Sequence, residues 1–348
     1  MRFASPFLKR VVYPIASKSG YLHRTRRIGP AIVTYHGIFP PGYQPRSTAL
    51  DGHLITHARF REHMRLLKAK YNLISPQRFR SYLQGGETCP PYTVLLTCDD
   101  GLVNVLTDML PIIKELDLPL LLFVTGASAS KAGSMLWYEK LYLWLQEGRG
   151  VASVQLAGMS KPIIARSLDP DLQWRPLIRE LSQFPREERE QLLCRVRTQL
   201  GIPETWESAY SQNESLRRRF FILQATELRE LSRAGVTIGA HTLSHPMLPN
   251  MPTELAYAEI ADSRTQIERV IGEPVWAFAY PFGDRESVGD READLAQSAG
   301  FECAFTNTEA EWSNTNFGLP RIHVSSETTA AELEAHVSGF YGRMRALL

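Results

Sequence analysis

Apolar, β-branched runs alternate along this chain with segments of helical periodicity, and this alternation most limits the folds that are open to it. We predict helices between the apolar runs, for example over residues 60–70, 105–116 and 253–271. Strands are predicted over residues 31–35, 93–98, 118–125, 236–240, 275–280, 301–305 and 319–324. Strands that alternate with helices build βα units around a parallel sheet, so the predicted fold class is α/β.

Two polar segments directly follow two of the predicted strands. One contains Asp99 and Asp100, and the other contains His241 and His245. Because catalytic groups gather at the carboxyl ends of parallel barrel strands, we expect these side chains to meet. Two imidazoles and one carboxylate can hold a divalent cation and leave a position for water, and the second carboxylate can take a proton from that water.

Each segment also has a plainer interpretation. Paired aspartates often cap helices, and single histidines usually make ordinary hydrogen bonds. The joint placement of both segments after strands favours the metal site, and therefore a hydrolase.

Composition narrows the class of protein. Lys and Arg total 39 against 37 Asp and Glu, which argues against a nucleic-acid partner. A chain of 348 residues with 44% hydrophobic content suits one large barrel domain or one domain with a sizeable insertion.

The four cysteines show no tight pairing pattern, and Cys98 lies inside the predicted site. Free thiols suit a reducing compartment, so the predicted location is the cytoplasm.

Residues 1–30 form a basic segment, since the first acidic residue of the chain is Asp51. Basic and apolar residues interleave here, so the segment is predicted to rest on an anionic membrane surface, at the inner membrane face. The alternative is a poorly ordered basic tail, because Pro6 and Pro14 interrupt a long helix. Its apolar runs are too broken for a signal peptide, and no stretch reaches the ~20 apolar residues that span a bilayer.

The barrel domain is predicted over residues 31–348, with a helical insertion at about 131–220. In that stretch the pattern changes to charge-rich helical segments punctuated by prolines. Four aromatic residues near its start could stack on sugar rings or, as is commoner at helical spacing, pack in a core. These residues are Trp137, Tyr138, Tyr142 and Trp144.

In the two polar segments after the strands, the chain resembles the polysaccharide deacetylase family. This family includes the chitooligosaccharide deacetylases of nodulation-factor synthesis. Residues 97–101 (Thr, Cys, Asp, Asp, Gly) are similar to the family's first motif, and residues 241–245 to its His, Thr or Ser, two residues, His motif. The resemblance extends over about residues 32–324. It implies a distorted (β/α) barrel of seven or eight units that holds a divalent metal ion, usually zinc. By position, it implies Asp100, His241 and His245 as metal ligands and Asp99 as the general base.

The family's third motif is incomplete in this chain. Many members have Arg, any residue, Pro, then Phe or Tyr, and the matching stretch contains Tyr280, Pro281 and Phe282 without the arginine. These three residues remain the predicted contacts to the substrate and its oxyanion. The missing guanidinium raises the question of what keeps Asp99 ionised and oriented.

A substitute is predicted on the last strand. Arg321 and His323 are two residues apart, so on a strand they point to one face. Arg321 is predicted to supply the guanidinium beside Asp99, and His323 to be the general acid. The alternative pairs Arg321 with a surface carboxylate and leaves His323 facing solvent. His36, after the first strand, is a weaker site candidate for which a structural role is expected.

The predicted protein is thus a metal-dependent carbohydrate N-deacetylase, an amidohydrolase that removes an acetyl group from an amino sugar. Its predicted cofactor is a divalent ion, foremost Zn²⁺, and its partner an N-acylated glycan or a lipid-linked saccharide. One alternative is a deformylase of a lipid-linked formamido sugar, which needs the same chemistry and a smaller acyl pocket. The other is a glycan-binding pseudoenzyme, which the incomplete third motif leaves open.

Overall fold

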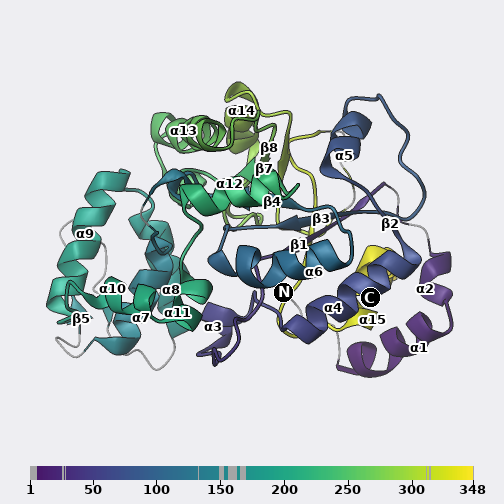
Figure 1. Ribbon diagram of the computed structural model, residues 1–348, viewed down its shortest axis with the longest axis horizontal. Coiled ribbons are helices and arrows are strands. Elements are labelled where there is room, and N and C mark those ends of the chain that lie inside the picture. The colour runs from purple at the N-terminus through teal and green to yellow at the C-terminus, as the bar shows by residue number, and fades with distance from the viewer. Residues whose placement is uncertain are drawn as a thin grey trace.

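A computed structural model describes most of the chain as one parallel sheet wrapped by helices (Figure 1). The described residues are 6–25, 27, 29–131, 133–148, 153–155, 163–164, 170–310, 312 and 315–347. Residues 1–5, Arg26 and Ile28 of the predicted basic segment, and several stretches of the predicted insertion, lie outside them. In the described part, no helix has both the length and the apolar character needed to cross a bilayer.

The main sheet has the strand order β10-β1-β3-β4-β7-β8-β9, and β2 pairs with β3 beside this path. Every pairing in it is parallel. Its strands are β1 (Ala31–Tyr35), β2 (Asn72–Leu73), β3 (Thr93–Cys98), β4 (Leu121–Val124), β7 (Thr237–Ala240), β8 (Ala277–Ala279), β9 (Cys303–Phe305) and β10 (Ile322–His323).

The two ends of this sheet approach each other. Leu319, just before β10, forms a parallel bridge with Phe305 of β9, while Ile322 pairs with Val33 of β1. The curled sheet confirms the predicted distorted (β/α) barrel. The last predicted strand, 319–324, is shorter than expected because the chain changes partner strand within it, at Pro320 and Arg321.

Helices cover the outside of the barrel (Figure 1). Their order follows the βα alternation that the sequence predicts. They include α3 (Thr48–Asp51), α4 (His57–Lys70), α5 (Pro76–Leu83), η2 (Val105–Met109), α6 (Leu110–Glu115), α12 (Ala225–Arg233), η4 (Leu248–Asn250), α13 (Thr253–Ile271), α14 (Asp290–Ser298), α15 (Ala330–Val337) and α16 (Phe340–Leu347).

The strands are buried on both faces, which explains their continuous apolar runs. Ile32 and Leu95 belong to an apolar cluster with Phe123 and Phe305. Their neighbours Val33 and Leu96 belong to a different cluster, which includes residues of the covering helices. Successive side chains on a strand point to opposite faces, so these two clusters are the two sides of the sheet.

Between β4 and β7 the chain forms a group of helices whose side chains make up most of a further apolar cluster, to which Tyr43, Leu50, Val103 and Met247 also belong. Trp137, Tyr142 and Trp144 are buried in this cluster, as the core interpretation of these aromatics expects, whereas Tyr138 is only partly buried. The division into barrel and insertion remains a prediction. The elements are η3 (Gly126–Ala129), α7 (Trp137–Glu147), the hairpin β5 (Ser153–Val154) and β6 (Ile163–Ile164), α8 (Pro170–Leu181), α9 (Arg186–Gln199), α10 (Trp206–Gln212) and α11 (Glu214–Phe220).

The N-terminal residues form three short helical elements, η1 (Leu8–Val12), α1 (Tyr13–Lys18) and α2 (Tyr21–Arg24). Buried Tyr13, Ala16 and Leu22 pack with Ala335 of α15 in a small apolar cluster. In Figure 1, α1 and α2 lie at one end of the molecule and α9 and α10 at the other.

Candidate active site

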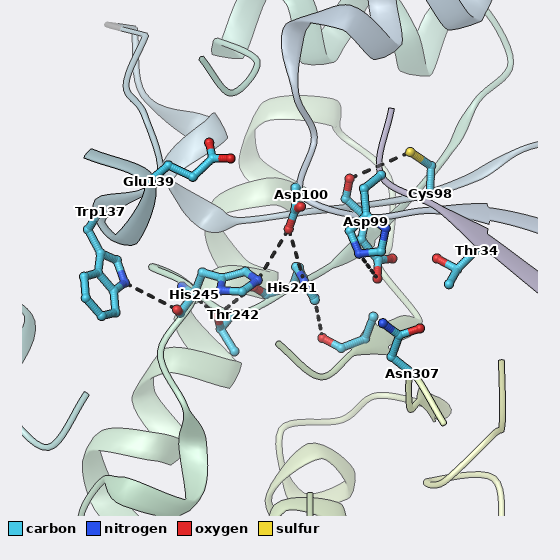
Figure 2. A network of polar contacts seen from close by, with 12 residues as sticks. Thr34, Cys98, Asp99, Asp100, Trp137, Glu139, His241, Thr242, His245 and Asn307 are labelled. Atoms are coloured by element: carbon cyan, nitrogen blue, oxygen red, sulfur yellow. Dashed lines mark hydrogen bonds and ion pairs between the residues drawn. The ribbon is translucent and has the colours of Figure 1, made fainter. Parts of the chain in front are cut away.

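The two polar segments converge at the carboxyl ends of β3 and β7. Ligand atoms of Asp100, His241 and His245 all lie within 4.8 Å of one another, and all three residues are buried. The Asp100 Oδ1 atom is 3.6 Å from His241 Nε2 and 3.4 Å from His245 Nε2. Figure 2 shows both imidazoles directed toward this carboxylate. The structure therefore brings together the three residues predicted to bind the metal.

Unusual backbone conformations concentrate around this cluster. Asp100, Thr242, His245 and Phe282 have positive φ angles of 71°, 60°, 59° and 61°. Non-glycine residues rarely adopt this region, and they do so mainly where a site demands it. Gly101 also has a positive φ, of 70°, and an added Cβ would lie 2.8 Å from a Val124 methyl group. The tight turn after the two aspartates therefore requires glycine.

The donor atoms fit a divalent cation. His241 Nδ1 is 2.7 Å from the Ala279 carbonyl oxygen, which only a protonated Nδ1 can satisfy as a donor. The Nε2 lone pair therefore faces Asp100 and is available as a ligand. Among the described residues, none makes a hydrogen bond to Asp100 Oδ1, although this atom is buried. Two imidazole nitrogens and one carboxylate oxygen form a common zinc ligand set.

Helices of the predicted insertion hold the loop that carries the two histidines. Trp137 Nε1 donates a hydrogen bond of 3.3 Å to the His245 carbonyl (Figure 2). Buried Arg189 donates to the Ser244 hydroxyl at 2.5 Å, and this hydroxyl donates to Glu259 at 2.5 Å. The Ser244 backbone N–H also donates to Glu259, at 2.8 Å. Helices α7 and α9 thus hold the loop on one side, and α13 holds it on the other.

Asp99 faces the other side of the site and pairs with Arg321. The guanidinium makes two parallel bonds to the carboxylate, 2.7 Å from Nη1 and 2.6 Å from Nη2. It also donates to the Thr306 carbonyl at 2.8 Å and to the Thr34 hydroxyl at 3.2 Å. Burial acts to raise the pKa of Asp99, but the charges of Arg321 and His241 and the Arg321 hydrogen bonds together outweigh burial and hold that pKa below its usual range. Asp99 is therefore ionised and fixed in orientation.

His323 lies two residues after Arg321, in β10. Its Nδ1 atom is 3.4 Å from the Asn307 amide nitrogen, and its ring centroid is 5.1 Å from that of His36. Burial and the nearby His36 imidazole lower the pKa of His323 to about 3, so the ring is neutral at physiological pH. His36 Nε2 is 3.9 Å from Asp99 Oδ2, so this weaker candidate also lies at the site.

The third-motif residues separate into two environments. Tyr280 is buried, and its hydroxyl donates to the Phe317 carbonyl at 3.0 Å, so that group is already engaged. The Phe282 ring instead lies 4.8 Å from the His245 ring, edge to face. Pro281 connects them, and its carbonyl accepts from the Gly283 N–H at 2.7 Å. Substrate and oxyanion contacts at these residues remain a prediction, best placed around Phe282.

Tyr138 was one of the four aromatic residues considered for stacking on sugar rings, whereas Glu139 was not predicted as a site residue. The Tyr138 ring lies 4.9 Å from the His245 ring and 5.8 Å from the Phe282 ring. Glu139 follows on α7, close enough to Asp100 for the Asp100 charge to act on the pKa of Glu139. Glu139 has no signal in the sequence beyond being an acidic residue at the start of the predicted insertion.

Glu139 shares one buried guanidinium with a second carboxylate. Arg219 Nη1 is 2.9 Å from Glu139 Oε1, and Arg219 Nε is 2.7 Å from Asp51 Oδ1. Burial raises the pKa of Glu139 to about 7, against the lowering effect of Arg219. This network links α3, α7 and α11.

The Cys98 thiol takes no part in this geometry. It is buried in the apolar cluster that includes residues of the covering helices, and it donates to the Asp99 carbonyl at 3.8 Å. Burial raises the pKa of this thiol well above its usual value. All four cysteines are unpaired.

Part of the chain is similar to a known protein family. The family model for polysaccharide deacetylase matches residues 204–304, a segment that includes both histidines. No curated protein matches the chain significantly.

Several solved structures share the fold. The Streptococcus pyogenes deacetylase PplD, solved with acetate, is 16% identical, with a TM-score of 0.57 over 89% of this chain and 99% of that one. IcaB from Ammonifex degensii is 16% identical, with a TM-score of 0.55 over 90% and 98%. A de-N-acetylase from Aggregatibacter actinomycetemcomitans is 15% identical, with a TM-score of 0.54 over 88% and 99%. The predicted resemblance to the polysaccharide deacetylase family is confirmed by the family-model match over residues 204–304, and the solved structures show that the chain shares their fold.

Proposed function

We propose that this protein is a zinc-dependent hydrolase that removes an N-acetyl group from an amino sugar of a glycan or glycan precursor. The observation that carries the proposal is the pairing of a buried Asp, His, His cluster with a second, ionised carboxylate beside it. A divalent cation held by Asp100, His241 and His245 would lower the pKa of a water molecule and polarise the acyl carbonyl.

Asp99 is the proposed general base. It is ionised because Arg321 lowers its pKa, and its orientation is fixed by two hydrogen bonds. It accepts a proton from the attacking water molecule as the new bond to the acyl carbon forms. A backbone N–H near Phe282 is proposed to stabilise the oxyanion, a contribution on the order of 3 kcal/mol.

His323 is the proposed proton donor to the leaving amine. Because its pKa is about 3, the imidazole enters the reaction neutral and must first receive a proton. That proton is the one that Asp99 takes from water. His36 contacts both residues and is the neighbour through which the proton can pass.

Arg321 also bears on the pseudoenzyme alternative. The missing third-motif arginine left open whether Asp99 would be supported as the base, and Arg321, directly before β10, supplies such support. This contact favours an active enzyme over a glycan-binding protein.

We also propose the identity of the metal, the substrate and the location of the protein. The metal is zinc, the substrate is an N-acylated or lipid-linked saccharide, and the location is the cytoplasm with contact to the inner membrane face. Deformylation of a formamido sugar would use the same residues, and the released acid distinguishes the two reactions.

The test is incubation of the zinc-loaded protein with N-acetylated amino-sugar oligosaccharides and their N-formyl analogues. We expect release of acetate, and loss of that release after chelation and dialysis. Release of formate alone would select the deformylase. Binding of the oligosaccharides without release of either acid would select the pseudoenzyme and overturn the proposal.

A further inference from the structure

Exposed large apolar side chains gather on one small part of the molecular surface. Of the five such side chains among the described residues, four belong to the N-terminal helical segment: Phe7 (62% exposed), Val11 (38%), Ile15 (64%) and Tyr21 (53%). The fifth, Tyr257 (40%), lies on α13. Single exposed apolar residues are ordinary, but a cluster of them marks a surface that binds a partner or a membrane.

The helical segment has two distinct sides. Phe7, Val11 and Ile15 are four residues apart, so they lie along one side of the helical run. Tyr13 and Ala16 lie on the other side and are buried against α15. The contact that holds the segment on the barrel therefore leaves the side with Val11 and Ile15 facing outward.

The outward side is also basic. Arg10, Lys18 and Arg24 are exposed on the same segment, and the first 50 residues of the chain contain no acidic residue. Apolar side chains among cationic ones are complementary to a surface with anionic headgroups over hydrocarbon.

Acidic side chains of α15 lie under the segment and are engaged there. Glu332 pairs with Lys9 at 2.7 Å, and Glu334 pairs with Lys70 at 2.8 Å. Both carboxylates are buried, so they contribute little negative charge to the outward side.

We infer that residues 7–24 form a docking surface for an anionic lipid bilayer. Phe7, Val11 and Ile15 insert at the boundary between headgroups and acyl chains, while Arg10 and Lys18 contact lipid phosphates. A second copy of this chain fits the surface less well, because two such surfaces would bring like charges together. This inference concerns a surface apart from the metal cluster and does not depend on the proposed reaction.

The experiment is co-sedimentation of the full chain with vesicles. One set contains equal parts of phosphatidylcholine and phosphatidylglycerol, and the other contains phosphatidylcholine alone. We expect binding at least about tenfold tighter to the anionic vesicles, weakening as salt is raised. The double variant Val11→Ser/Ile15→Ser is expected to bind about tenfold or more weakly, because both insertions are lost.

Tyr257→Ser is the matched control, since it removes an exposed aromatic side chain elsewhere, and it is expected to bind like the unchanged protein. Hydrolysis of a soluble oligosaccharide should be the same in all three proteins, which separates this inference from the proposed function. Equal sedimentation with both vesicle types, or full binding by the double variant, would overturn it. So would a lipid-free dimer that the double variant converts to a monomer, because the surface would then be a protein interface.

Discussion

The Asp99 side and the Asp100 side of the candidate site are built in opposite ways. Asp99 has both carboxylate oxygens bonded to one buried guanidinium. Asp100, the next residue, has a buried Oδ1 with no hydrogen bond from the described residues and two imidazole nitrogens facing it. Adjacent carboxylates thus have different functions because of their partners: one is held as a base and the other is left open for a cation.

The largest expected effect comes from Asp100→Asn. An amide oxygen is a poor ligand for zinc beside two imidazoles, so we expect loss of bound metal and of detectable turnover. Metal content after gel filtration, measured by atomic emission, checks this. If the Asp100→Asn protein kept one metal ion per chain, Asp100 would not be a required ligand, and the two aspartates could not be assigned different functions.

Asp99→Asn should lower turnover by about 10²- to 10⁴-fold, the usual contribution of a general base. Metal content should stay at the level of the unchanged protein, because this side holds no ligand. A thermal melt serves as the folding control, since the change leaves the Arg321 charge buried without its carboxylate. Normal turnover in a folded, metal-loaded variant would show that another group is the base.

His323 offers a sharper test of the Asp99 side. With a pKa of about 3 in the free protein, it should produce no fall in kcat/KM between pH 6 and 7. We expect His323→Gln to lower kcat by about 10²-fold without changing the shape of the kcat/KM profile in that range. An alkaline limb near pH 6.5 that disappears in the variant would show that His323 is charged before the reaction.

Arg321→Lys should have the smallest effect of the four, roughly tenfold on turnover, because lysine keeps the charge but loses the paired geometry. Arg321 lowers the pKa of Asp99, so weakening the contact must raise that pKa. Activity needs ionised Asp99, and the acid limb of the rate profile should therefore move to higher pH. An acid limb at the same pH as in the unchanged protein would mean that another group keeps Asp99 ionised.

Much of the fold followed from the sequence because the strands are buried on both faces. Runs such as Ala31–Tyr35 and Thr93–Cys98 are mainly apolar and buried at every position, and their positions are as predicted. The placement of Asp100, His241 and His245 after such strands led to the expectation that they would meet.

Other features depend on contacts that no local pattern encodes. Glu139 and Arg189 approach the site from the helices between β4 and β7, and their partners are far away in the sequence. The change of partner strand at Pro320 and Arg321 arises where the barrel ends meet. The low pKa of His323 follows from its surroundings, chiefly burial and His36, which its position along the chain does not reveal.

Anomalous diffraction from crystals grown with zinc tests the central claim most directly. We predict one strong peak bounded by Asp100 Oδ1, His241 Nε2 and His245 Nε2, at about 2.0–2.2 Å from each. Both oxygens of Asp99 should stay on Arg321. A peak elsewhere, or an Asp99 carboxylate that has left Arg321 to bind the zinc ion, would contradict the account.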